Sequence, residues 1–109
     1  NIQKNYLSDF NNVEYVEIND VENINENFDL FMSHNCLEET PYEYQNFIFN
    51  KFLVKSKLVF VTQNINGVHT NIDCTKSHNK LLEHLHNQYD EVSVVNSTTD
   101  KNKKIILAK

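Results

Sequence analysis

Two cysteines and two nearby histidines are the residues of this chain best suited to hold a metal ion or to form a covalent bond. His34 and Cys36 lie two positions apart, and Cys74 and His78 lie four apart. Together they could supply the four ligands of a tetrahedral zinc ion, although these spacings match no known zinc finger. The cysteines could instead close a disulfide in a secreted chain or remain free thiols in a reducing compartment. We favour free thiols, and with them an intracellular over a secreted location.

No other group of residues has the spacing of a catalytic site. His84 and His86 flank Leu85, and on a helix two such neighbours point away from each other. The chain has no serine–histidine–acid pattern and no phosphate-binding loop. The sequence therefore predicts no catalytic residue, no cofactor, no metal site and no enzymatic activity.

Three lysines near the end of the chain are the candidate partner-binding residues: Lys101, Lys103 and Lys104. Such a cluster could contact phosphate, an acidic protein or a lipid headgroup. It could also be a solvated loop tip that protects an edge strand from pairing with other chains.

Length and charge limit the class of protein. The 109 residues fit one domain, 1–109, in which residues 1–12 are expected to form a flexible arm. The chain has a net charge of −5 and no arginine, which argues against a partner of duplex nucleic acid. Acidic residues dominate positions 1–50 and lysines dominate 51–109. No apolar run is long enough for a membrane span.

Hydrophobic periodicity predicts one strand and two helices in the first half of the chain. The β-branched and aromatic run Val13–Ile18 predicts a short strand that could add to a sheet edge. Apolar residues at helical spacing predict a helix near residues 20–33. The segment Thr40–Glu43 has the pattern of a capping box with proline in the first turn, and predicts a helix that continues to about Val54.

Turn signals predict two hairpins in the second half. Asn66–Gly67 favours a two-residue turn that pairs Val61 with Ile72 and Val59 with Cys74. A third helix, capped by Thr75 or Ser77, follows. Its buried stripe consists of Leu81, Leu82, Leu85 and Tyr89. Strands at 91–96 and 104–109 flank a polar loop. The predicted fold is α+β: an antiparallel sheet built from two β-hairpins with about three helices packed on it.

The predicted order from Thr40 to Lys109 is helix, hairpin, helix, hairpin. This order resembles the start of the actin-depolymerising-factor homology domain, and is similar to longin-type and roadblock-type domains. The resemblance covers about two-thirds of the chain and rests on topology. It implies a binding module of the cytoskeleton or of trafficking machinery.

A shorter segment resembles an enzyme signature. Residues 62–69 read Thr-Gln-Asn-Ile-Asn-Gly-Val-His, which resembles the sirtuin motif Thr-Gln-Asn-Ile-Asp-Gly-Leu-His, and Leu85–His86 is similar to the part of that family that holds the catalytic histidine. The resemblance implies an NAD pocket lined by this segment. Gly67 is the one glycine of the chain, so the glycine-rich NAD loop of the family is missing.

The expectation that best fits these observations is a non-enzymatic protein-interaction domain, with a partner on the sheet edge or on the acidic first half. One alternative is a degenerate sirtuin-like NAD-binding fragment. Another is a secreted or cell-surface binding domain held by a Cys36–Cys74 disulfide. The sequence does not specify the oligomeric state.

Overall fold

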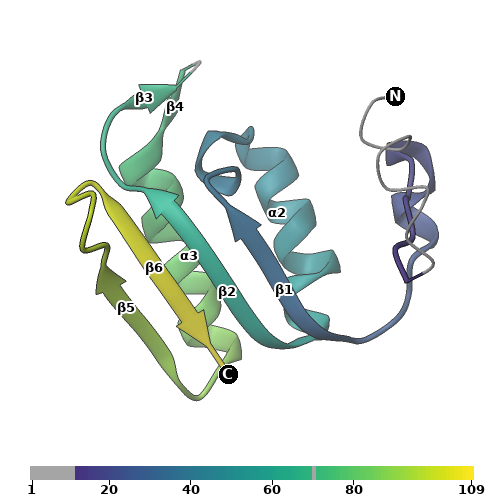
Figure 1. Ribbon diagram of the computed structural model, residues 1–109. Helices are drawn as coiled ribbons and strands as arrows, with labels where there is room; N and C mark the ends of the chain where they lie inside the picture. Colours follow the sequence, from purple (N-terminus) through teal and green to yellow (C-terminus); the bar gives the residue numbers. More distant parts are fainter. Residues whose placement is uncertain (1–11, 70) are drawn as a thin grey trace.

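Two α-helices pack on one face of a four-stranded mixed sheet with the strand order β1-β2-β6-β5 (Figure 1). The structure is a computed structural model, and it describes residues 12–69 and 71–109. The sheet strands and the α-helices are, in chain order, β1 (Phe28–His34), α2 (Tyr42–Lys51), β2 (Ser56–Asn64), α3 (Cys74–Gln88), β5 (Val92–Asn96) and β6 (Lys103–Ala108). Short elements join them: 3-10 helices η1 (Ile18–Asn23), η2 (Leu37–Glu39) and η3 (Leu53–Lys55), and a small ladder of β3 (Val68–His69) with β4 (Ile72–Asp73).

The fold class is α+β as predicted, but its details differ. The sheet is mixed, because β1 runs parallel to β2 while the β2–β6 and β5–β6 pairs are antiparallel. The described chain has two α-helices where about three were expected. None of its helices is long and apolar enough to cross a membrane.

The first half contains the largest corrections. The strand predicted at Val13–Ile18 does not form, since residues 13–17 lie outside any strand and Ile18 begins η1, and the expected arm at 1–12 falls almost entirely outside the described residues. The helix predicted near 20–33 is wrong: η1 ends at Asn23, and Phe28–His34 forms β1. The helical spacing of the apolar residues is overridden here by pairing with β2, which places Leu30 beside Leu58 and Met32 beside Phe60.

Helix α2 was predicted correctly, but the capping box that predicted it does not form. Thr40 Oγ1 donates a hydrogen bond to the Cys36 carbonyl at 2.9 Å, and no side chain caps the helix. The helix begins at Tyr42, directly after Pro41, and its end at Lys51 is followed by η3. Helix α2 therefore serves as the crossover between the parallel strands β1 and β2.

The first predicted hairpin is wrong in its pairing. Gly67 has a positive φ of 96° but Asn66 does not, so the predicted two-residue turn does not form; a ladder of only two pairs follows Gly67, Val68 with Asp73 and His69 with Ile72. Asp73 then caps α3 by accepting from the Lys76 N–H at 3.1 Å, in place of the predicted Thr75 or Ser77. Strand β2 pairs instead with β1 and β6, so the hairpin behind the actin-depolymerising-factor resemblance is missing.

The helix and the two strands of the last third of the chain were predicted correctly, apart from the residue that caps α3. Helix α3 buries Leu81 and Leu85, and β5 and β6 pair antiparallel on either side of a polar loop. The core lies between the helices and one face of the sheet; its buried members are Leu37, Phe49, Leu53, Val59, Val61, Leu81, Leu85, Ile106 and Ala108.

Candidate functional site

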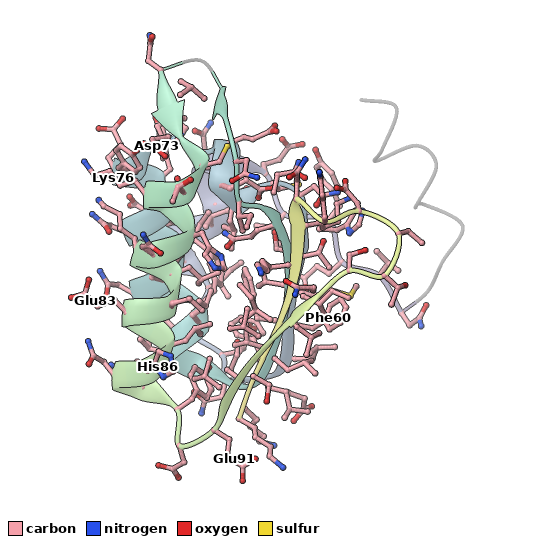
Figure 2. The ribbon with its side chains drawn as sticks, turned by 90° about the vertical axis from the view of Figure 1, so that its left-hand side faces the viewer. Phe60, Asp73, Lys76, Glu83, His86 and Glu91 are labelled. Carbon is pink, nitrogen blue, oxygen red and sulfur yellow. The ribbon has the colours of Figure 1, made fainter. Side chains whose placement is uncertain are left out.

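The face of the sheet turned away from α2 and α3 is rich in exposed apolar side chains. Successive residues of a strand point to opposite faces, so Val59, Val61 and Ile106 face the helices while their neighbours face outward. Figure 2 shows Phe60 on the side of the sheet opposite α3. We call this surface the bare face; its large members, each 48% to 68% exposed, are Leu30, Met32, Leu58, Val95 and Leu107.

The bare face is hollowed over the half of the sheet where β1, β2 and β5 begin and β6 ends. The hollow has a volume of about 630 Å³ and is lined by Met32, Phe60 and Leu107 among others. Glu91 and Lys109 line its end, where Lys109 Nζ lies 3.2 Å from Glu91 Oε2. The lining is therefore apolar in its centre and carries one ion pair at one end.

The strand sequences are unusual for a sheet with a solvated face. A half-exposed sheet normally alternates apolar and polar residues, whereas strands covered on both faces are continuously apolar. Here the central strands β2 and β6 contain the runs Leu58–Val61 and Ile105–Ala108, which are apolar at every position. These runs are the signal that could have revealed the bare face from the sequence. It was missed because the outward face of β2 was paired with the polar residues of the wrong hairpin partner.

The three candidate lysines are separated by the fold. Lys101 is exposed in the turn before β6. Lys103 shares the outward side of β6 with Ile105 and Leu107, whereas Lys104 faces the helix side, where its Nζ donates a hydrogen bond to Asn96 Oδ1. Strand β6 lies inside the sheet, so the lysines do not protect it as an edge strand. Their role in binding a partner stays a prediction.

A second candidate site is the polar cluster at the carboxyl end of β2, which contains the sirtuin-like residues. In open sheets with parallel strands, this end is where ligands commonly bind. Thr62 Oγ1 lies 2.6 Å from His34 Nδ1 at the end of β1, and Gln63 Oε1 lies 2.9 Å from His78 Nδ1 on α3. Thr62, Gln63 and His78 are all buried. Successive residues of a strand point to opposite faces, so the Thr62–His34 pair lies on the outward face and joins β2 to β1, while the Gln63–His78 pair lies on the helix side and joins β2 to α3.

A buried carboxylate lies beside this cluster. Glu38 in η2 is fully buried, and its Oε1 accepts from the Asn64 N–H at 2.8 Å. Its Oε2 has no hydrogen-bond partner among the described residues. Burial, together with the negative charges of Glu38, Glu39 and Asp73, raises the pKa of the Cys74 thiol. Cys74 is therefore held as a neutral thiol, which makes it a poor nucleophile.

Two histidines of α3 are held neutral by their surroundings. Burial lowers the pKa of His78, and the nearby Lys104 ammonium lowers it further. Burial also lowers the pKa of His84, whose ring lies 5.0 Å from the Phe49 ring. Both groups are built into the packing between α3 and its neighbours.

The structure does not bring the sirtuin-like residues together. His78 contacts Gln63, and His86 lies eight residues farther along the same helix, which is about 12 Å at the usual rise. Figure 2 shows His86 near the end of α3 opposite to Asp73 and Lys76. The residue similar to the catalytic histidine therefore lies away from the segment expected to line an NAD pocket.

The cysteines and their neighbouring histidines form no joint site. Cys36 is exposed, Cys74 is buried, and both are free thiols. Cys36 Sγ donates to the His34 carbonyl at 3.0 Å. Among the residues that the structure describes, no group of three histidine, cysteine or acidic side chains is placed to hold a metal ion.

Comparisons with known proteins add no relative to this picture. No protein-family model, no curated protein and no solved structure matches the chain. The bare face and the polar cluster are therefore interpreted from their own geometry.

Proposed function

We propose that this chain is a protein-interaction domain and that the bare face of its sheet is the surface that binds the partner. The observation that carries the proposal is the set of large apolar side chains exposed on four neighbouring strands. Contiguous apolar surface of this kind is rare on monomeric proteins and marks interaction sites. A partner that covers the bare face gains the free energy of removing these side chains from water.

The polar cluster supports this choice over a catalytic one. Thr62, Gln63 and His78 are buried, and their hydrogen bonds, Thr62 with His34 and Gln63 with His78, stabilise the junction of β1, β2 and α3. The apolar side chains of the bare face, in contrast, have no partner element among the described residues. A cytoskeletal or trafficking partner stays a prediction of the sequence.

Site-specific crosslinking tests the proposal. A photoreactive amino acid replaces Met32, the most exposed apolar residue of the bare face, in protein expressed in its source cells. The matched position is Glu83, which is exposed on α3 on the opposite side of the sheet. We expect a protein adduct from position 32 and none from position 83. Absence of any protein adduct from position 32 would refute the proposal.

A further inference from the structure

We propose that Asn66 is a modification site, at which the side-chain amide is converted spontaneously into a carboxylate by attack of the Gly67 backbone nitrogen. This inference goes beyond the proposed function and rests on residues outside the bare face. Gly67 is the one glycine of the chain, so Asn66–Gly67 is its one asparagine–glycine pair. The tight turn expected at this pair does not form, which leaves the pair without that structural role.

The conversion requires only hydroxide and water. Hydroxide removes the proton of the Gly67 nitrogen, which then attacks Cγ of Asn66. The new N–Cγ bond closes a five-membered succinimide ring, while the bond from Cγ to Nδ2 breaks and Nδ2 takes up a proton and leaves as ammonia. Water then opens the ring at one of its two N–C bonds. Opening at Cγ gives aspartate, and opening at the backbone carbonyl carbon gives isoaspartate, in which the main chain runs through the side chain.

The structure leaves both reacting groups open. Asn66 and Gly67 are exposed, so hydroxide and water reach them. A side chain after asparagine would shield the attacking nitrogen, but glycine has none, and even a Cβ added at Gly67 would meet nothing within 4 Å beyond its chain neighbours. The Gly67 N–H donates no hydrogen bond to any residue that the structure describes. Asn66 Nδ2 donates to Asn102 Oδ1 at 2.8 Å, but this bond is exposed and water can replace it.

A second pair of similar chemistry is protected by the fold. Asn96–Ser97 is the one asparagine–serine pair of the chain, and serine shields the attacking nitrogen little. Here the Ser97 N–H donates to the Lys103 carbonyl at 3.0 Å, and Asn96 Oδ1 accepts a hydrogen bond from Lys104 Nζ. Attack by the Ser97 nitrogen would break the start of the β5–β6 pairing. The fold therefore leaves Asn66 open and holds Asn96.

The reactive pair lies where the end of β2 is fastened to its neighbours (Figure 1). On one side, the Ile65 N–H donates to the Asn102 carbonyl at 2.9 Å, in the turn before β6. On the other side, the Cys74 N–H donates to the Gly67 carbonyl at 3.1 Å, and Thr75 Oγ1 donates to the Ile65 carbonyl at 2.5 Å. Residues 65–67 thus connect β2 with the beginning of α3 and with the turn before β6.

The modification weakens this connection in two ways. The new carboxylate faces Asn102 Oδ1 with no proton to donate, in a hollow of about 320 Å³ whose other charged lining residues are Glu39 and Asp100. Isoaspartate also lengthens the main chain by one methylene, so the hydrogen bonds on both sides of the pair cannot all keep their geometry. Cys74 lines the same hollow and is 4% exposed, so loosening of residues 65–67 exposes its thiol.

Peptide mapping by mass spectrometry of the folded full chain, incubated at mildly alkaline pH, tests the conversion. We expect residue 66 to become a mixture of aspartate and isoaspartate at a rate that rises in proportion to the hydroxide concentration, while Asn96 stays an amide. In guanidinium chloride the fold no longer protects Asn96, which should then be modified as well. Asn66→Gln is the matched control, because it keeps the amide and the larger ring that glutamine must form closes far more slowly.

The consequence is measured on Cys74, in protein in which Cys36→Ser removes the exposed thiol. After incubation, Cys74 should react with a thiol reagent at neutral pH at least about fivefold faster than in fresh protein. Asn66→Gln protein incubated in the same way should keep the slow rate. Circular dichroism of the incubated protein shows that the fold is retained, so that a faster reaction reflects local opening.

Three results would overturn the inference. They are a folded chain in which residue 66 stays an amide while it converts in guanidinium chloride, a folded chain in which Asn96 converts as fast as Asn66, and a modified protein whose Cys74 reacts as slowly as in fresh protein. None of these touches the proposed function, which fails only if position 32 yields no protein adduct.

Discussion

Mild acid should destabilise this fold through two histidines of α3, the buried His78 and the half-buried His84. In the folded chain, burial lowers the pKa of both His78 and His84 from the ordinary value of 6.5. The unfolded chain therefore binds more protons than the folded chain once the pH falls below about 6.5. The stability is fully present above that pH and is progressively lost as the pH decreases toward the lowered pKa values of the folded state.

The size of the effect follows from proton linkage. Each histidine that is protonated in the unfolded chain but neutral in the folded one contributes a slope of up to about 1.4 kcal/mol per pH unit. Two such groups give up to about 2.7 kcal/mol per unit, against a total stability of ~5–15 kcal/mol for an ordinary domain. Neighbouring charged groups do not cancel this loss of stability. The Lys104 ammonium opposes protonation of His78. Beside His84, Lys80 and Glu83 carry charges of opposite sign, so their effects on its protonation offset each other.

Urea unfolding followed by circular dichroism between pH 7.5 and about 5 measures the slope before most carboxylates titrate. His78→Gln and His84→Gln should each reduce the slope, and the double variant should nearly remove it. His86→Gln is the matched control, because His86 is exposed on the same helix. The reasoning is refuted if the double variant loses stability with acid as steeply as the wild type.

Three other substitutions test the packing around α3 by urea unfolding at neutral pH. Tyr89→Phe should cost about 1–2 kcal/mol, because the hydroxyl lies 2.5 Å from the Leu53 carbonyl and 2.6 Å from the Ser56 carbonyl and shares its one proton between them; an unchanged stability would mean that water satisfies these carbonyls in the variant. Leu85→Ala should cost about 3–5 kcal/mol, while Leu82→Ala, on the half-buried side of the same helix, should cost clearly less; equal losses would contradict the burial pattern. Asp73→Ala should cost about 1 kcal/mol by removing the cap, and Asp73→Asn should recover most of it; a helix insensitive to both changes has no functioning cap.

The elements that could be predicted from the sequence are those whose pattern is set by residues close together in the chain. Helix α3 has its buried Leu81 and Leu85 one turn apart, and strands β5 and β6 are joined by a short polar loop. In both cases the local signal agrees with the packing against distant residues, in the core for α3 and along β2 for β6. The spacing of apolar residues in the sequence then matches the positions that are buried in the fold.

The elements that could not be predicted depend on distant partners. The spacing of Val21, Ile24, Phe28 and Phe31 fits one helical face, but the strand at Phe28–His34 gains its hydrogen bonds from β2, about 28 residues later. The predicted two-residue turn at Asn66–Gly67 does not form, since Gly67 has a positive φ and Asn66 does not, and β2 pairs with β6 and not with the segment that follows this bend. Whether a face of a sheet is apolar or polar depends on which strands lie side by side. Because β2 was predicted to pair with the wrong segment, the apolar bare face was not predicted.

Strand β2 also determines the order in which this fold can be completed. It is the strand next to both β1 and β6, and β6 begins about forty residues after β2 ends. A ribosome that adds ~5–20 residues per second makes that interval roughly 2–8 s long. During this time the apolar run Leu58–Val61 can pair with β1 alone, and its other edge stays open.

An open apolar strand edge is a template for pairing with other chains. Newly made copies of this protein therefore carry an aggregation-prone edge for seconds before their own β6 can close it. We infer that the yield of folded protein depends on how quickly the last strand arrives, so that slow translation or a truncation before Lys103 should send the chain to aggregates or to chaperones.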